Sequence, residues 1–174
     1  MTDLSSTLAE VREKAGKYLT FFLAGEEYGL EILKVREIIG VMDITDVPGT
    51  PEFVKGVINL RGKVIPVLDL RLKFGMPSVE QTEETCIIVV DVGGVEMGII
   101  VDRVSEVLDI SSEAIEDPPS FGVNVNTDFI LGMGKAEGSV KILLDIDEVL
   151  TAGEFGELAG VAEAAAGEEL EVND

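Results

Sequence analysis

Short apolar runs alternate with polar turns along the body of the chain. In the central stretch, two apolar runs at 57–60 and 64–70 flank a polar tip at 61–63. Short β-branched runs on either side of a glycine-bearing tip predict a β-hairpin. Pro66 has no amide proton to donate, so we expect its part of the second strand at a sheet edge or a bulge. The hairpin thus holds the guanidinium of Arg61 at a tight, solvated turn.

This hairpin recurs further along the chain. Shifted by 76 positions, residues 53–70 align with 129–146, and a second block recurs with a shift of 69. Two blocks repeated in the same order indicate an internal duplication of one β unit of roughly 65 residues, which predicts a pair of small packed barrels because two copies are too few for a solenoid. The first block matches Phe53, Gly56, Gly62, Val64, Leu68 and Asp69 with Phe129, Gly132, Gly138, Val140, Leu144 and Asp145, and the second matches Gly25, Glu27, Gly29, Val35, Glu37 and Ile38 with Gly94, Glu96, Gly98, Val104, Glu106 and Val107.

The remaining elements follow from the same patterns. Residues 31–39 fit both a helix and a strand, and we prefer a strand from Val35 onward because a barrel has to close. Thr50 and Pro51 predict the cap and first position of one helical turn over 51–55. We expect a helix to start at Asp147. The expected organisation is mainly β, and it comprises a lead at 1–16, a first barrel at 17–80, a second barrel at 81–150 and an acidic tail at 151–174 that is helical in patches or disordered. Exchange of strands between the barrels is left open.

The composition of the chain indicates its cellular compartment. Apolar residues make up 46% of the chain, yet no apolar run approaches the roughly 20 residues that span a bilayer. The first 20 residues have no apolar stretch typical of a signal peptide, and the single Cys86, expected to be a small buried residue, excludes an intrachain disulfide. We therefore expect a cytoplasmic protein.

The net charge of −21 narrows the range of partners. The body of the chain carries −13 of it and the tail after Leu150 carries −7. Such a field repels phosphate backbones and anionic membranes and attracts basic partners. A barrel that binds single-stranded nucleic acid also needs basic residues and stacking aromatics, whereas this chain has two Tyr and no Trp. We expect neither a nucleic-acid partner nor membrane insertion.

Candidate chemistry is sparse. The chain lacks histidine, the commonest general base, and contains no phosphate-cradling glycine motif. Asp145 and Asp147 could share a strand face and bind a hard cation, although a solvated pair is the simpler interpretation. Asp102 follows an apolar strand and is either a buried acid or, as we prefer, a turn or interface residue. We therefore expect no catalytic residue, no cofactor and no metal, and a carboxylate-metal enzyme is the weaker alternative.

An interaction role is what remains. Val35 is expected to be exposed beside Glu37, and Glu37 is a candidate ion-pair partner for Arg61 at the hairpin tip. Such a pair is either an ordinary surface contact worth about 0–1 kcal/mol or an anchor for a partner, since arginine is favoured at interfaces. The residues by themselves leave these two interpretations open.

Four segments resemble the CheW-like family of bacterial chemotaxis coupling proteins. The resemblance covers about residues 17–150, and its most specific part is the Asn-Leu-Arg-Gly turn followed by Pro-Val-Leu-Asp-Leu. It implies two five-stranded SH3-like barrels around a shared core. The segments are Glu27 to Ile38, Phe53 to Gly62, Ile65 to Arg71 and Gly98 to Asp102.

The resemblance also implies a function. Family members are non-catalytic scaffolds that couple the cytoplasmic signalling tips of methyl-accepting chemoreceptors to the regulatory domain of the chemotaxis histidine kinase, in arrays at the membrane. An adaptor for a non-flagellar chemosensory pathway is the alternative. In the family, partner binding is affected at the positions that match Val35, Glu37, Gly56, Arg61, Gly62, Val104 and Val107. The acidic tail lies outside the resemblance and receives no function from it.

Overall fold

The structure is a computed structural model. It describes residues 16–117 and 128–150, together with residues 153, 154, 156, 158 and 160. Most of the expected lead and most of the acidic tail lie outside these residues. Among the described residues, no helix is long and apolar enough to cross a membrane.

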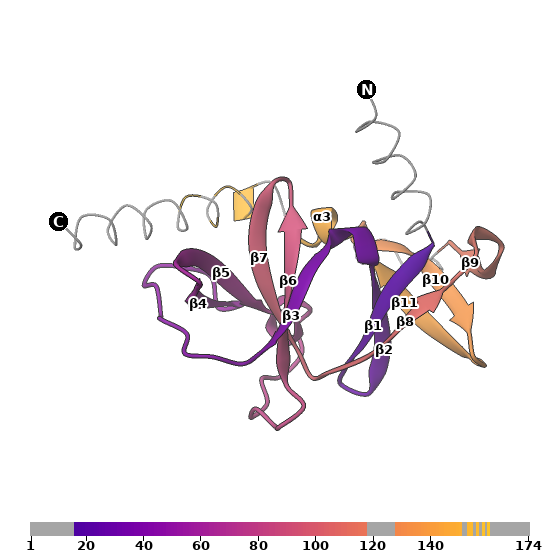
Figure 1. Cartoon of the computed structure of the whole chain (residues 1–174), viewed down its shortest axis with the longest axis horizontal. Coiled ribbons are helices and arrows are strands. Elements are labelled where there is room, and N and C mark those ends of the chain that lie inside the picture. Colours follow the sequence, from indigo (N-terminus) through magenta and orange to yellow (C-terminus); the bar gives the residue numbers. More distant parts are fainter. Residues whose placement is uncertain are drawn as a thin grey trace.

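Two antiparallel-rich sheets make up the fold (Figure 1). We call the five-stranded sheet, in the order β3-β6-β7-β5-β4, the Arg61 barrel, and the six-stranded sheet, in the order β8-β1-β2-β11-β10-β9, the Glu137 barrel. The predicted mainly β fold is therefore confirmed. The strands are β1 (Lys17–Leu23), β2 (Glu26–Glu31), β3 (Val35–Gly40), β4 (Val54–Leu60), β5 (Lys63–Asp69), β6 (Cys86–Val92), β7 (Val95–Val101), β8 (Arg103–Asp109), β9 (Ile115–Glu116), β10 (Ile130–Ala136) and β11 (Ser139–Leu144).

Each barrel takes strands from both sequence copies. The β1–β2 hairpin of the first copy pairs in parallel with β11 of the second, through Leu143 and Gly29. In the same way, the β6–β7 hairpin of the second copy pairs with β5 of the first, through Val67 and Gly98. The exchange of strands that the sequence left open therefore occurs, and the chain crosses between the barrels twice, after β2 and after β7.

The Arg61 barrel is closed by a segment outside its named strands. Thr45 pairs with Val57 of β4, with backbone N–H···O distances of 2.8 and 2.9 Å between the two residues. Gly56 lies at the β-bulge beside this bridge and has a φ of +138°. A Cβ atom at Gly56 would lie 2.0 Å from the carbonyl oxygen of Thr45. Only glycine lets the closing segment approach β4 this closely.

The Glu137 barrel is closed in an equivalent way. Its edge strands β8 and β9 are consecutive in the chain, joined through the 3₁₀ turn η2 (Ser112–Ala114), and β9 pairs with β10. Gly132, the counterpart of Gly56, again lies at a bulge, and a Cβ atom there would lie 2.8 Å from the carbonyl oxygen of Glu116. The duplicated sequence thus builds the same closure twice.

One apolar cluster is shared by both barrels. It includes Phe21 and Leu30 of the Glu137 barrel and Leu68 and Ile99 of the Arg61 barrel, all almost fully buried. Four aromatic rings stack in a row with centroid distances of 5.0–6.0 Å, in the order Phe21, Tyr28, Phe74 and Phe129. A smaller cluster around Ile65 and Val89 fills the Arg61 barrel.

One local prediction is confirmed. The ambiguous stretch at 31–39 contains the 3₁₀ turn η1 (Ile32–Lys34) and then β3 from Val35, as preferred. The prediction that Pro66 lies at a sheet edge or a bulge was wrong, because β5 is an inner strand and Pro66 pairs with Val57 of β4, away from the bulge at Gly56. Pro66 does lie one residue before the pairing of β5 with β7 begins at Val67. The equivalent Ile142 does pair with β2, so the missing amide proton of Pro66 coincides with one missing ladder position.

Other local predictions were wrong. Residues 51–53 form a turn, in which the amide of Val54 donates to Pro51 at 3.0 Å, and the hydroxyl of Thr50 donates to the carbonyl of Val47 and caps no helix. The extended β4 strand begins at Val54 and leaves no room for a helical turn. The helix expected at Asp147 is α3 (Ile146–Val149), which begins one residue earlier because Asp145 provides the N-cap.

Candidate functional site

Arg61 is held at the tip of the β4–β5 hairpin by a two-residue turn. Arg61 and Gly62 both have positive φ, 52° and 85°, as a type I′ turn requires. The amide of Gly62 donates to the side-chain oxygen of Asn59 at 2.8 Å. Residues on both sides of the turn are paired in the hairpin, so the backbone of Arg61 is held in a fixed position at the barrel rim.

The predicted ion pair between Glu37 and Arg61 is present. The guanidinium of Arg61 donates from Nη1 to Oε1 of Glu37 at 3.2 Å and from Nη2 to Oε2, so the contact is bidentate. The hydrogen bond from Arg61 lowers the pKa of the Glu37 carboxyl below its usual value. The Arg61 side chain nevertheless remains 69% exposed. Glu37 therefore orients a charged group that is still open to a partner.

Two further ion pairs in the Arg61 barrel were missed by the sequence analysis. Lys63 of β5 pairs with Glu96 of β7 at 2.7 Å, and Arg36 of β3 pairs with Asp91 of β6. The Arg36 hydrogen bond lowers the pKa of Asp91. All four side chains occur in the printed sequence as ordinary surface charges, so only the strand order could have paired them.

Val35 differs from the expectation. It pairs with Val90 of β6 and lies half-buried against the shared apolar cluster. A β-bulge between Val35 and Glu37 shifts the register of β3 at this point. The expected exposed apolar residue of this strand is instead Ile38, whose exposed fraction is 45%. Val35 and Gly56 therefore support the Arg61 rim, while Glu37, Arg61 and Gly62 form it.

Val104 and Val107 lie apart from this rim, on β8 of the Glu137 barrel. Val104 is half-buried against the shared cluster, whereas Val107 is 50% exposed. β8 pairs with β1 along one side and is the outermost strand of its sheet. The seven predicted site residues thus fall on two surfaces, one on each barrel.

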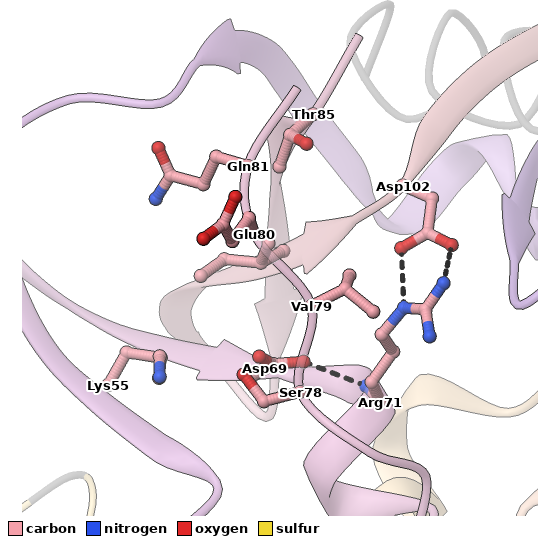
Figure 2. Close-up of a pocket in the computed structure, with 10 residues that line it drawn as sticks. Lys55, Asp69, Arg71, Ser78, Val79, Glu80, Gln81, Thr85 and Asp102 are labelled. Atoms are coloured by element: carbon pink, nitrogen blue, oxygen red, sulfur yellow. Dashed lines mark hydrogen bonds and ion pairs between the residues drawn. The ribbon is translucent and has the colours of Figure 1, made fainter. Parts of the chain in front are cut away.

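Asp102 lies at the turn where β7 passes into β8, which agrees with the preferred interpretation of this residue. Its carboxylate accepts two hydrogen bonds from the guanidinium of Arg71, including Nε to Oδ1 at 2.8 Å, as Figure 2 shows. Arg71 lies in the short helix α2 (Leu70–Lys73), which Asp69 caps. Burial acts to raise the pKa of Asp102, but the hydrogen bonds from Arg71 and from the amide of Ala24 outweigh it, so the pKa is lowered.

The described residues contain no group of three or more His, Cys, Asp or Glu that could hold a metal ion. Asp145 and Asp147 do not share a strand face, because Asp145 caps α3 and Asp147 pairs with Lys34 at 2.8 Å. Cys86 is half-buried at the start of β6 and not fully buried as expected, and burial raises the pKa of its thiol. The predicted site residues thus lie on two exposed surfaces, and the one on the Arg61 barrel carries an ordered ion pair at its rim.

Comparisons with known proteins identify the family of the chain. The profile of the CheW-like domain family matches residues 17–154. The chain is 41% identical over 162 residues to chemotaxis protein CheW of Klebsiella aerogenes, covering 90% of this chain and 98% of that protein. It is 37% identical over 135 residues to CheW of Bacillus subtilis, covering 77% of this chain and 86% of that protein.

A solved structure shows the same architecture. The scaffolding protein TtCheW of Thermoanaerobacter tengcongensis superposes with a TM-score of 0.73 at 38% identity, covering 80% of this chain and 94% of that one. The family profile, the relatives and the solved structure all indicate the same family. The chain belongs to the CheW-like domain family, whose members are non-catalytic scaffolds of bacterial chemotaxis.

Proposed function

We propose that the protein couples the signalling tips of chemoreceptors to the regulatory domain of the chemotaxis histidine kinase within arrays at the membrane. The observation that carries the proposal is the exposed Arg61 guanidinium, oriented by Glu37 on a tight turn. A charged group fixed in this way is suited to recognition because little conformational freedom is lost when a partner binds. The family supplies the class of partner.

The two barrels offer two separate docking places. The rim of the Arg61 barrel presents Glu37, Arg61 and Gly62, whereas β8 of the Glu137 barrel presents the half-exposed Val107. We assign the charged rim to the helical receptor tip and the apolar β8 surface to the kinase, whose regulatory domain is a pair of related barrels. A scaffold that carries both faces on one rigid body can pass a movement of the receptor to the kinase.

Arg61→Ala tests the receptor face. The Arg61 side chain is largely exposed, and a surface ion pair of this kind contributes little to folding, so the melting temperature should stay close to that of the wild type. Receptor-dependent activation of the kinase, measured as ATP-dependent phosphorylation in reconstituted arrays, should fall about tenfold. Normal activation by a folded Arg61→Ala protein would show that the rim is not used.

Glu137→Ala is the matched control, because Glu137 occupies the same position at the tip of the equivalent hairpin and also has a φ of +52°. It should leave receptor-dependent activation unchanged. Val107→Glu tests the other face: it should weaken binding of the isolated kinase regulatory domain while receptor binding persists. Loss of receptor binding in Val107→Glu, with kinase binding intact, would reverse the assignment of the two faces.

A further inference from the structure

One carboxylate contacts both barrels at a point where the chain crosses between them. Asp102 ends the crossing from β7 of the Arg61 barrel to β8 of the Glu137 barrel. Its Oδ1 accepts from Nε of Arg71, in the helix that follows β5 of the Arg61 barrel, at 2.8 Å. Its Oδ2 accepts from the amide of Ala24, in the β1–β2 turn of the Glu137 barrel, at 2.9 Å.

The backbone at this crossing is tied down as well. The amide of Asp102 donates to the carbonyl of Phe22 at 3.1 Å, and the guanidinium of the next residue, Arg103, lies 4.0 Å from the centre of the Phe22 ring. The apolar cluster shared by the barrels holds them together, but burial of apolar surface has no preferred direction. Hydrogen bonds, in contrast, have a preferred direction. The contacts of Asp102 are therefore suited to setting the angle at which the barrels meet.

The other crossing, from β2 to β3, is built differently. Leu33 occupies the position equivalent to Asp102, and the ion pair there joins Lys34 to Asp147 at 2.8 Å. The side chains of Lys34 and Asp147 are 36% and 40% exposed, whereas those of Arg71 and Asp102 are 15% and 27% exposed. The crossing from β7 to β8 therefore has a bidentate, half-buried ion pair between Arg71 and Asp102. The crossing from β2 to β3 has only the more exposed surface pair of Lys34 and Asp147.

The Asp102 contact can be weakened without opening the core. Two adjoining surface hollows are both lined by Arg71 and Asp102 and by Val79, Glu80 and Thr85 of the segment between α2 and β6 (Figure 2 shows one of them). Solvent therefore reaches the contact from outside. An isosteric change of the carboxylate to an amide removes the charge but creates no cavity among the buried apolar side chains.

We propose that Asp102 is a positioning residue that fixes the angle between the two barrels and thereby couples their docking faces. This inference rests on the proposed function, in which each face holds a different partner. In this proposal Asp102 acts through the angle between the barrels and contacts neither partner. Its removal should leave each separate binding event intact and impair the transfer of the signal between them.

A distance measurement tests the geometric half of the proposal. Spin labels at Glu52→Cys in the Arg61 barrel and Val140→Cys in the Glu137 barrel, both exposed positions, report the separation of the barrels in a Cys86→Ala background. The distance distribution should be narrow in the otherwise unchanged chain and broader or shifted with Asp102→Asn. Lys34→Met, which removes the ion pair at the other crossing, is the matched control and should leave the distribution narrow.

Binding and activation test the functional half. With Asp102→Asn, the dissociation constants for the isolated kinase regulatory domain and for a receptor signalling fragment should each stay within about threefold of the wild type, while receptor-dependent kinase activation falls about fivefold or more. Arg71→Lys keeps the charge but loses the bidentate geometry. Receptor-dependent activation with this variant should therefore lie between that of the wild type and that of Asp102→Asn. Lys34→Met should activate normally.

Three results would overturn the inference: an unchanged distance distribution with Asp102→Asn, unchanged activation, or a parallel loss of binding to one partner, which would make Asp102 a contact residue. Failure of the proposed function is separate from these results. In that case the wild-type chain itself would not activate the kinase, whereas the spin-label distances would still report whether Asp102 fixes the barrels.

Discussion

The two barrels have similar backbone arrangements, but they differ in the side chains at their rims and in their interiors. Both close at a bulge next to a glycine, Gly56 or Gly132, and both use an aspartate to cap the short helix that follows the hairpin. Yet Arg61 at one hairpin tip is replaced by Glu137 at the other, and Ile65 inside one barrel by Lys141 inside the other. The positions that agree are those that the chain geometry needs.

The positions that differ include the charged residues at the two rims. Glu37 and Arg61 form an ion pair, whereas the equivalent residues of the Glu137 barrel, Glu106 and Glu137, are both acids and cannot do so. One rim thus carries an oriented positive group on a protein of net charge −21, and the other adds to the negative field. The duplication kept the glycines that close the barrels, whereas the charges at the two rims diverged.

The largest expected effect concerns the closing glycines. Gly56→Ala places a Cβ atom 2.0 Å from a backbone oxygen at a φ of +138°, where no flexible side chain can yield. We expect it to lower the free energy of unfolding by about 3 kcal/mol or more. Gly132→Ala meets the Cγ2 methyl of Ile115 at 2.5 Å and the carbonyl oxygen of Glu116 at 2.8 Å, but Gly132 does not have a positive φ, so the change should cost about 1–3 kcal/mol. Urea unfolding of both variants measures the difference, and equal losses would contradict the larger cost expected from the closer carbonyl approach at Gly56.

An intermediate effect is expected at Lys141. Its side chain is only 2% exposed, and its ammonium donates to the carbonyl of Ala136 at 2.8 Å and to the hydroxyl of Ser139 at 2.6 Å, with Glu27 at 3.3 Å. Lys141→Met removes all three contacts and should lower the free energy of unfolding by about 1–3 kcal/mol. Much of this loss comes from the unpaired Glu27 carboxylate, so adding Glu27→Gln should restore at least half. A double variant no more stable than the single one would show that the loss arises elsewhere.

The smallest expected effect is the pH dependence of the Asp102 contact. Because the pKa of Asp102 is lowered in the folded state, the carboxylate stabilises the fold above its unfolded pKa, about 3.9, and loses this contribution as the pH falls below it. At pH 7, Asp102→Asn should be less stable than the wild type by about 1 kcal/mol or less, since the pair is only half-buried. The difference should shrink as the pH is lowered through the folded-state pKa of Asp102, which lies below the unfolded value. A difference in urea unfolding that stays constant from pH 7 down to the lowest pH at which both proteins fold would assign the loss to the amide of Asn and not to the missing charge.

The sequence alone determined the strands, the hairpins and their duplication. Alternating and β-branched runs are local signals, as are the glycines that turns and bulges need. The Glu37–Arg61 pair was predictable because the residue pattern placed Glu37 on a strand adjacent to the hairpin tip that carries Arg61. The turn at 51–53 was mistaken for a helix because local capping residues outweighed the tertiary demand for β4.

Only the tertiary structure decided which strands pair and what the crossings hold. Strand exchange is invisible in a duplicated sequence, because β2 would satisfy its ladder equally well beside β11 or beside β5. The two-pronged contact joins Arg71 to Asp102, residues 31 positions apart. Likewise, Lys141 appeared as an ordinary charge in a strand until its partners surrounded it. Local propensity fixes each element, whereas contacts between distant residues exist only once the chain has chosen its partners in space.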